Sequence, residues 1–410
     1  MIKYNNAHDN YMEDIIIYGY NSIGEAVYYE CTRRNNTVLC FCEDTKVSKD
    51  KFGVDIDVLT LDEIIEKKIN GRFIICISNV RPVIEKLESA GLYTWELVND
   101  YLREENYKRV SYKMRPYKVA VKEIESCILC HKYFQIPDSL FLRSTDLEIT
   151  ERCSLRCKEC SNLMQYYNSP KDYSVEEVIG WVDSFLKYID GVYEMRILGG
   201  EPFMHREIHR IIEKIVSYPK IHSIVIYSNA TIMPTEEMWD IFENEKIRFE
   251  LTNYGELSRN FLNIKKELDK RAIVYYVNEM DSWTPCSSII KHGRDEKSLK
   301  NIYDGCCVKN TITLLNGRIY KCPYAANAIN LKAIPEVEGE YVDLRQLEDV
   351  ASDTAKSILY QYLYLKKYLF SCDYCNGRPY SGVEIEPAVQ ISEPLNYEKV
   401  GEGQNYEYGQ

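Results

Sequence analysis

The sequence predicts an α/β protein in which parallel strand–helix repeats occur twice and a cysteine-rich segment follows them. Three observations support this. Short apolar runs alternate with stretches of helical character near the N-terminus and again in the middle of the chain. The 410 residues exceed one ordinary domain, so two or three domains are expected. The chemically distinctive residues directly follow the apolar runs, at the carboxyl ends of the expected parallel strands.

The first repeat covers residues 1–115 and predicts a small, parallel, Rossmann-like sheet. Its expected strands are 14–18, 37–42 and 72–77. Gly19 and Gly24 form a G-x4-G turn, and Asp44 lies near the usual place of a ribose-binding acid, but Asn21 replaces the middle glycine of G-x-G-x-x-G. Two hypotheses remain for this domain: a nucleotide or nucleotide-sugar site, and a structural or partner-docking role.

Residues 116–144 are charged and are interpreted as an irregular connector. It contains the C-x2-C-H spacing of a c-type haem attachment site, at Cys127, Cys130 and His131. Such attachment needs an exported chain, and the start of this one has no apolar signal-peptide core. A helical turn with two half-buried thiols is the favoured interpretation, and a metal or redox role is the alternative.

The second repeat covers residues 145–300. Its expected strands are 147–150, 194–198, 223–227, 246–251 and 272–277, with a sixth at 311–315. Ser174 and Glu177 form a capping box that predicts a helix reaching about Ile189. In parallel βα barrels the chemistry lies at the carboxyl ends of the strands, and the motifs of this region all lie at such ends.

A run of three cysteines follows the first of these strands. Cys153, Cys157 and Cys160 are spaced C-x3-C-x2-C. Three thiolates this close can hold three irons of a [4Fe–4S] cluster and leave the fourth iron open for a small molecule. Zinc sites usually show paired C-x2-C halves, so zinc or chance thiols are the less favoured interpretations.

This run resembles the signature of the radical S-adenosylmethionine (SAM) enzymes. In that family the open iron binds the amino and carboxylate groups of SAM. An electron from the cluster splits SAM into methionine and a 5′-deoxyadenosyl radical, which takes a hydrogen atom from the substrate. The resemblance implies a partial (β/α)6 barrel as the fold of this region.

Further positions match the SAM-binding elements of the family. Gly199, Gly200, Glu201 and Pro202 match a turn that binds the SAM amino group. The two glycines let the backbone approach the ligand, and the glutamate can accept a charge-assisted hydrogen bond from an ammonium. In the family, polar residues after the third and fourth strands often contact the SAM ribose and carboxylate. The residues at these places in this sequence are Ser228, Asn229, Thr252 and Asn253. Helix capping is an equally open alternative for each of them.

Residues 301–380 contain a second set of cysteines. Cys307 and Cys322 flank a predicted hairpin with an Asn-Gly turn, and Cys372 and Cys375 follow as C-x2-C. The set resembles the auxiliary-cluster extensions called SPASM and twitch. No cysteine follows the last of these, so a twitch-like form with one [4Fe–4S] cluster is expected, giving two clusters in all. Cys306 is the alternative to Cys307, and a structural zinc is the alternative to iron.

Composition limits the partners and the setting. The net charge of −12 argues against a broad nucleic-acid or anionic-membrane surface, and the chain has no apolar run long enough to span a membrane. A cytoplasmic protein is expected, in which the 15 cysteines stay reduced. Oxygen-sensitive clusters suggest an anaerobic or microaerobic setting. Residues 381–410 are acidic and are expected to be extended or disordered.

The resemblance implies a radical SAM oxidoreductase or epimerase acting on a small, carbohydrate-like or nucleotide-linked substrate. Its reductant would be a protein such as flavodoxin or ferredoxin. Cys286 follows the last clear barrel strand and could give a hydrogen atom to a substrate radical, with a buried structural thiol as the alternative. Modification of a peptide or protein (RiPP maturation) is the second hypothesis, and a non-catalytic iron–sulfur scaffold is the third.

Overall fold

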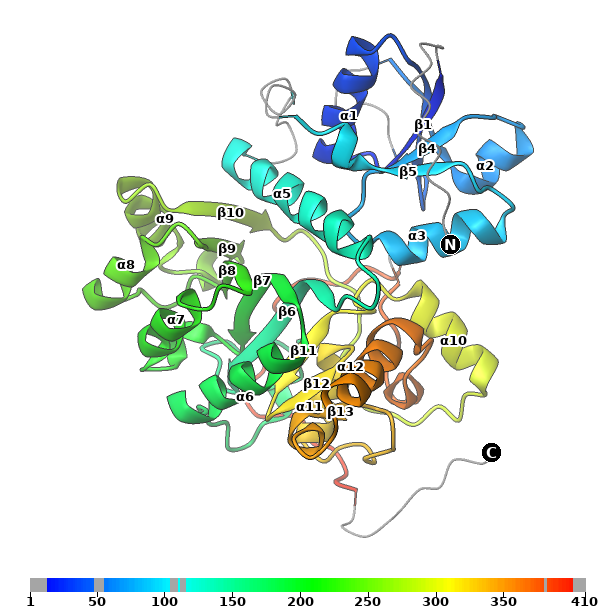
Figure 1. Cartoon of the computed structure of the whole chain (residues 1–410). Helices are drawn as coiled ribbons and strands as arrows, with labels where there is room; N and C mark the ends of the chain where they lie inside the picture. Colours follow the sequence, from blue (N-terminus) through cyan, green and yellow to red (C-terminus); the bar gives the residue numbers. More distant parts are fainter. Residues whose placement is uncertain (1–12, 48–54, 104–109, 111–115, 380–381, 401–410) are drawn as a thin grey trace. The chain divides into compact units, whose positions relative to one another are not determined.

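The chain forms two compact units, Met1–Pro137 and Asp138–Gln410. The computed structural model describes residues 13–47, 55–103, 110, 116–379 and 382–400. Each unit has its own sheet of predominantly parallel strands with helices beside it (Figure 1). The prediction of an α/β protein with two strand–helix repeats is therefore confirmed.

The first unit contains a five-stranded parallel sheet in the order β3-β2-β1-β4-β5. This order matches the first five strands of the doubly wound, Rossmann-like order 3-2-1-4-5-6. Its strands are β1 (Asp14–Tyr18), β2 (Thr37–Glu43), β3 (Val58–Thr60), β4 (Arg72–Ile75) and β5 (Trp95–Leu97). Its helices are α1 (Ser22–Arg33), α2 (Leu61–Glu66), α3 (Val80–Ser89) and α5 (Tyr117–Phe134).

The glycine turn after β1 has a local structural explanation. The Asn21 side chain accepts hydrogen bonds from the amides of Ile23 and Gly24, at 2.9 and 3.0 Å, and so caps α1. A Cβ on Gly24 would lie 2.0 Å from the carbonyl oxygen of Gly19. The G-x4-G spacing thus lets the first turn of α1 pack against the end of β1, whatever else the domain binds.

The expectation of an irregular segment at 116–144 was wrong for Tyr117–Phe134, which forms the 18-residue helix α5. Ile124 and Cys127 on this helix are fully buried in the core of the first unit, so apolar packing outweighs the charged composition. His131 is also buried; its Nε2 lies 2.9 Å from the carbonyl oxygen of Ile77, and burial lowers its pKa to about 4. The Cys127–His131 segment is therefore helical and packed inside the unit.

The second unit contains an eight-stranded sheet in the order β10-β9-β8-β7-β6-β11-β12-β13. Its strands are β6 (Phe141–Thr150), β7 (Gly191–Gly199), β8 (Ile221–Ser228), β9 (Ile247–Asn253), β10 (Val274–Glu279), β11 (Ile312–Leu315), β12 (Arg318–Tyr320) and β13 (Val342–Asp343). The first five are parallel and adjacent in chain order. The sixth parallel strand, β11, pairs with β6 and not with β10. The last of the parallel strands therefore lies beside the first of them.

Helices connect and cover these strands. They are α6 (Val175–Tyr188), α7 (Ile208–Val216), α8 (Glu236–Phe242), α9 (Phe261–Lys270), α10 (Glu296–Gly305), α11 (Pro323–Asn330) and α12 (Ser352–Tyr360). Helices α6 to α9 lie along one face of the β6–β10 sheet (Figure 1). The predicted capping box is present, because Ser174 and Glu177 exchange side-chain-to-backbone hydrogen bonds at the start of α6.

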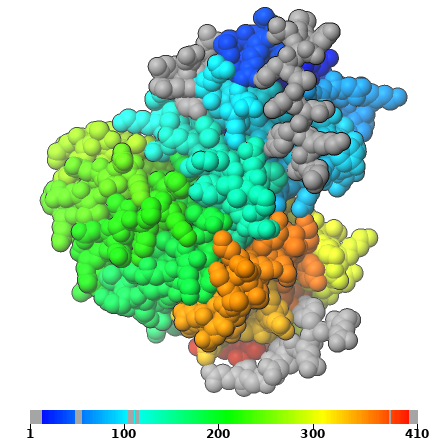
Figure 2. All heavy atoms as spheres, in the orientation of Figure 1, coloured from blue at the N-terminus to red at the C-terminus, as the bar shows by residue number. Residues whose placement is uncertain are grey.

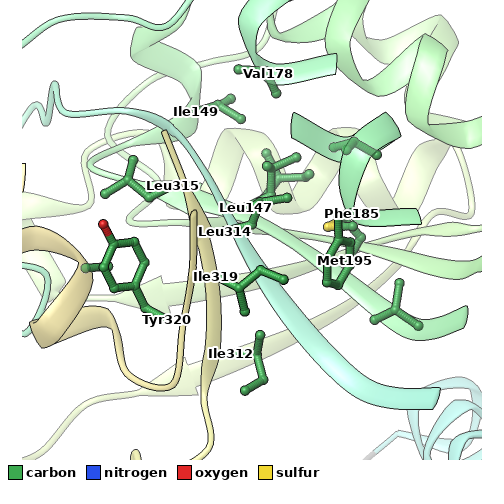
Figure 3. Close-up of a cluster of buried hydrophobic side chains, with 14 of the residues drawn as sticks. Leu147, Ile149, Val178, Phe185, Met195, Ile312, Leu314, Leu315, Ile319 and Tyr320 are labelled. Atoms are coloured by element: carbon green, nitrogen blue, oxygen red, sulfur yellow. The ribbon is translucent and has the colours of Figure 1, made fainter. Parts of the chain in front are cut away.

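The barrel strands and the cysteine-rich end share one hydrophobic core. Leu147 on β6 and Met195 on β7 pack near Ile312 and Ile319 of the β11–β12 hairpin, with Phe185 of α6 beside them (Figure 3). All five side chains are fully buried or nearly so. This shared core explains why β11 joins the sheet beside β6, and it makes the C-terminal extension part of the same unit.

The last described segment is extended and held by backbone hydrogen bonds. Ile385 pairs with Trp283 in both directions, at 2.8 and 2.9 Å, and the Val400 amide donates to the Lys332 carbonyl at 2.9 Å. Part of this segment is visible in red at the surface of the second unit (Figure 2). Of the two forms expected for the tail, the extended one fits residues 382–400; residues 381 and 401–410 lie outside the described residues. Among the described helices, none is long and apolar enough to cross a membrane.

Candidate functional site

The cysteine run lies in the loop that leaves the carboxyl end of β6. Cys157 is 8% exposed, while Cys153 and Cys160 are partly buried. Burial, together with the nearby Cys160, raises the pKa of Cys157 to about 11. Thiols in such a place stay neutral unless a cation stabilises the thiolates, as metal binding does. Three cysteines within eight residues of one loop fit, by their spacing, the iron–sulfur cluster expected from the sequence.

The Gly-Gly-Glu-Pro turn is docked against the start of this loop. The amides of Gly200 and Glu201 donate to the carbonyls of Thr150 and Arg152, both at 2.9 Å. A Cβ on Gly199 would lie 2.2 Å from the Thr150 oxygen, and one on Gly200 would lie 2.1 Å from the Arg152 oxygen. The two glycines are thus needed for contact between two chain segments. The sequence-based expectation, that Gly199 and Gly200 let the backbone approach SAM, stays a prediction.

Glu201 is held by three hydrogen bonds within the protein. Its carboxylate accepts hydrogen bonds from the Ser228 hydroxyl at 2.9 Å, the Asn229 amide at 2.8 Å and the Phe203 amide at 3.4 Å. Burial raises the pKa of Glu201 to about 7 even though these donors favour the carboxylate. The side chain therefore ties the end of β7 to the end of β8, and its predicted contact with the SAM ammonium would use its remaining acceptor capacity.

Asn229 connects the end of β8 with the cysteine loop. Its Nδ2 lies 3.7 Å from the Cys153 sulfur and 3.3 Å from the Ser154 hydroxyl. Its Oδ1 accepts from the Thr231 amide at 3.0 Å. Of the strand-end residues predicted to meet SAM, Asn229 is thus placed directly beside a cluster cysteine, whereas Ser228 is buried against Glu201.

The end of β9 adds a residue that sequence reasoning missed. Tyr254 follows Thr252 and Asn253, and burial raises its pKa, with the three cysteines of the run acting in the same direction to a smaller extent. Asn253 donates to Glu279 at 2.8 Å and accepts from the Gly255 amide at 3.1 Å. The sequence could have indicated this residue, because Tyr254 directly follows the two polar residues at the end of the strand.

The second set of cysteines lines a single cavity. The lining includes Cys286, Cys306, Cys322, Cys372 and Cys375, together with Ser161 and Arg378. Cys307 is not among the lining residues, although it is adjacent in sequence to one that is. As they stand, no three His, Cys, Asp or Glu side chains in the described ranges are grouped closely enough for a single metal ion. Four of the predicted ligands therefore line the same cavity if Cys306 is taken as the first, and Cys286 lines it as well.

The C-x2-C turn is held by Arg294. Its guanidinium donates to the carbonyls of Cys372 and Cys375, at 2.6 and 2.9 Å, and the Gly377 amide donates to the Cys375 sulfur at 3.4 Å. A hydrogen bond from the Cys372 thiol, with the amide and the guanidinium, lowers the pKa of Cys375 below its ordinary value. This environment favours a thiolate, which is the form that binds metals and iron–sulfur clusters.

Comparisons with known proteins agree with the cysteine run. Residues 147–252 match the family described as the Radical SAM superfamily. Among curated proteins, the GTP 3′,8-cyclase of Stenotrophomonas maltophilia (strain K279a) is 30% identical over 89 residues, which is 22% of this chain and 27% of that protein. That of Listeria monocytogenes serotype 4b (strain CLIP80459) is 30% identical over 86 residues, 20% of this chain and 25% of that protein. The chain spans about a quarter of the length of these relatives.

Two solved structures show weaker likeness. BtrN in complex with AdoMet and 2-DOIA has 16% identity and a TM-score of 0.37, covering 63% of this chain and 99% of that one. Streptococcus suis SuiB bound to S-adenosylmethionine has 15% identity and a TM-score of 0.28, covering 56% of this chain and 49% of that one. The family match by itself begins on β6 and ends on β9, so it contains the cysteine run and the Gly-Gly-Glu-Pro turn docked beside it. The second unit of this chain therefore carries a domain of the radical SAM superfamily.

Proposed function

We propose that this protein takes a hydrogen atom from a small, carbohydrate-like or nucleotide-linked substrate and thereby oxidises or epimerises it. The observation that carries the proposal is the cavity lined by four auxiliary-type cysteines and Cys286, in the same unit as the radical SAM cysteine run. Held by Cys153, Cys157 and Cys160, a reduced [4Fe–4S] cluster would supply the electron that splits SAM into methionine and a 5′-deoxyadenosyl radical.

SAM would lie at the carboxyl ends of β6 to β9. The three cysteines leave one iron position open, and the turn Gly199–Pro202 would present its backbone to the SAM amino group. Asn229 beside Cys153 is placed to orient the methionine end, and Thr252 with Asn253 would meet the ribose. Tyr254, which packs edge-on against Trp283, would help to exclude water from the radical.

The second cluster would be held by Cys306, Cys322, Cys372 and Cys375, with Cys306 in place of Cys307. The common cavity supports this choice, because all four proposed ligands line it and Cys307 does not. Such a cluster can accept an electron from a substrate radical, which makes the net reaction an oxidation, or it can hold the substrate. A structural zinc on the same thiolates is the alternative that metal analysis would decide.

Cys286 would serve as the hydrogen donor if the reaction is an epimerisation, and the thiyl radical left on its sulfur would be restored to the thiol by one electron from the reductant and a proton from solvent. Its side chain is 8% exposed and lines the same cavity. Burial raises the pKa of Cys286 to about 11, and Arg378 and Cys160 lie near enough to influence it. The thiol therefore keeps its hydrogen at neutral pH, which a hydrogen-atom donor requires.

The test is anaerobic turnover of the reconstituted protein with SAM, a reductant and panels of sugars, sugar nucleotides and nucleotides including GTP. The curated relatives are named for a reaction of GTP, which supports including nucleotides. Products are followed by mass spectrometry in D2O. Epimerisation through Cys286 predicts one solvent deuterium in the product, and C286A should stop product formation while 5′-deoxyadenosine still forms.

Oxidation predicts a product two mass units lighter than the substrate, with no deuterium gained. Formation of 5′-deoxyadenosine without any small-molecule product, together with modification of a peptide encoded beside this chain, would contradict the proposal and favour peptide modification.

A further inference from the structure

The extended segment Ile385–Val400, which we call the C-terminal strap, runs along the radical SAM cysteine loop. The Lys158 amide donates to the Val389 carbonyl at 2.8 Å, and the Ile391 amide donates to the Arg156 carbonyl at 3.0 Å. These bonds lie on either side of an antiparallel bridge between Cys157 and Gln390. The strap thus pairs with the loop at the middle cysteine of the run.

The Gln390 side chain points at that cysteine. Its Nε2 donates to the Cys157 sulfur at 3.2 Å and to the Ala388 carbonyl at 2.6 Å, while its Oε1 accepts from the Arg156 amide at 2.8 Å. These bonds fix the orientation of the amide. Exchanging nitrogen and oxygen would set two donors against each other at Arg156 and two acceptors at Ala388. The N–H group is therefore directed at the sulfur.

The strap is anchored on both sides of Gln390. Ile385 is paired with Trp283, and Ala388 is 2% exposed. Farther on, the Leu395 amide donates to the Gln165 carbonyl at 2.9 Å, and the ring of Tyr397 packs edge-on against Tyr166. Since Gln165 and Tyr166 follow the cysteine run directly, the strap is fixed to the cysteine loop and to the segment after it.

We propose that the strap is part of the radical SAM cluster site and that Gln390 is a positioning residue that directs an N–H group at the Cys157 thiolate. This rests on the proposed function, because it takes Cys157 as a cluster ligand. Hydrogen bonds to the sulfurs of a cluster help to set its reduction potential. An N–H dipole stabilises the extra negative charge of the reduced form, so Gln390 makes the cluster easier to reduce.

The experiment is a redox titration of the reconstituted full-length protein, with dithionite as the one-electron source and EPR as the readout. The relevant cluster is identified by the change of its EPR signal when SAM is added. The test variant is Gln390→Glu, which keeps the shape and the acceptor for the Arg156 amide but removes the donor to sulfur. Gln390 is exposed, so the substitution leaves the core intact.

We expect Q390E to shift this potential to a more negative value. At a fixed potential, the ratio of oxidised to reduced cluster should rise about tenfold, which is about 59 mV for a one-electron couple. The matched control is Val389→Glu, which adds the same charge at an exposed neighbour and leaves the backbone bonds in place. V389E should retain the wild-type potential. An unchanged potential in Q390E, or an equal shift in V389E, overturns the role of the N–H group.

A chelator challenge gives a second readout. Loss of iron from the SAM-responsive cluster should be several-fold faster in Q390E than in the wild type, because the side chain at position 390 no longer donates to the Cys157 sulfur. If no SAM-responsive cluster forms on Cys153, Cys157 and Cys160, the proposed function and this inference fall together. If that cluster forms and cleaves SAM normally but Q390E matches the wild type in potential and iron loss, only this inference falls.

Discussion

The two sets of cysteines are built in different ways. The first occupies one loop, Cys153 to Cys160, directly after β6. The second set is collected from separate elements: Cys306 ends α10, Cys322 precedes α11, and Cys372 and Cys375 lie on a later turn. Spacing alone therefore identifies the first set, whereas packing decides which side chains make up the second.

A short polar connection links the two sets. Helix α11 starts directly after Cys322, and its Asn327 donates to both carboxyl oxygens of Glu148 on β6, at 2.9 and 3.1 Å. Asn330, at the end of the same helix, donates to Glu151 at 2.9 Å. The helix that follows an auxiliary-type cysteine is thus bonded to the strand that leads into the radical SAM run. We expect substitutions in one set of cysteines to alter the surroundings of the other set through these hydrogen bonds.

The largest expected effect is a loss of SAM cleavage, which distinguishes the roles of the two sets of cysteines. Replacing Cys153, Cys157 or Cys160 by Ala should reduce SAM cleavage to the level of protein without iron, because the site loses a ligand to the cluster. Cys372→Ala should spare uncoupled cleavage but impair substrate turnover. Both are measured as 5′-deoxyadenosine and product by chromatography. A Cys157→Ala protein that cleaves SAM at the wild-type rate would refute the first site.

Iron content tests the membership of the second set. Two cubane clusters predict about eight irons per chain. Cys306→Ala should lower the reconstituted value to about four, and Cys307→Ala should leave about eight, because Cys306 lines the common cavity and Cys307 does not. The reverse pattern would make Cys307 the ligand. About four irons with one zinc in the wild type would support the structural zinc.

Stability measurements test how the first site is held. Gly200→Ala would place a Cβ 2.1 Å from the Arg152 oxygen, so the turn or the cysteine loop must move. We expect a loss of about 2 kcal/mol in unfolding free energy and weaker iron binding. Gly180→Ala is the control, since its Cβ would meet nothing within 4 Å and it lies inside α6. That change should be neutral or stabilise by up to about 1 kcal/mol. Equal effects of the two substitutions would contradict the docking argument.

The smallest expected effect is a pH dependence in the link between the sets. Burial raises the pKa of Glu148 to about 8 from an ordinary 4.5, and Asn327 offsets only part of this. The folded state therefore holds a proton that the unfolded state has lost, so this group costs stability progressively as the pH rises from about 4.5 to 8. Glu148→Gln removes that cost. Relative to the wild type, it should be more stable at pH 8 than at pH 5.5 by about 2 kcal/mol.

The check is the difference in thermal unfolding between wild type and E148Q at the two pH values. Glu177→Gln, on the exposed cap of α6, serves as the control. Hydrogen bonds from Ser174 lower the pKa of Glu177, so it is ionised in both states at pH 5.5 and at pH 8. It should show no such pH-dependent difference. A difference between wild type and E148Q that does not change with pH would contradict the raised pKa.

Local patterns in the sequence were sufficient for much of this molecule. The strand–helix alternation predicted two parallel sheets, and Ser174 with Glu177 predicted the start of α6. The spacing of Cys153 to Cys160 predicted the radical SAM domain. Each of these features is set by residues that are neighbours in the chain, so single-sequence reasoning reaches them.

Only the tertiary structure decided features that depend on distant contacts. Cys306 and Cys307 are adjacent in sequence, and the way α10 ends determines which of them faces the cavity. The place of β11 beside β6 depends on a shared core. The acidic composition of the tail gave no sign that Gln390 pairs with Cys157, because backbone hydrogen bonds hold the strap and these do not depend on hydrophobic side chains. The sequence by itself determined the loop of three closely spaced cysteines, and packing determined what surrounds that loop.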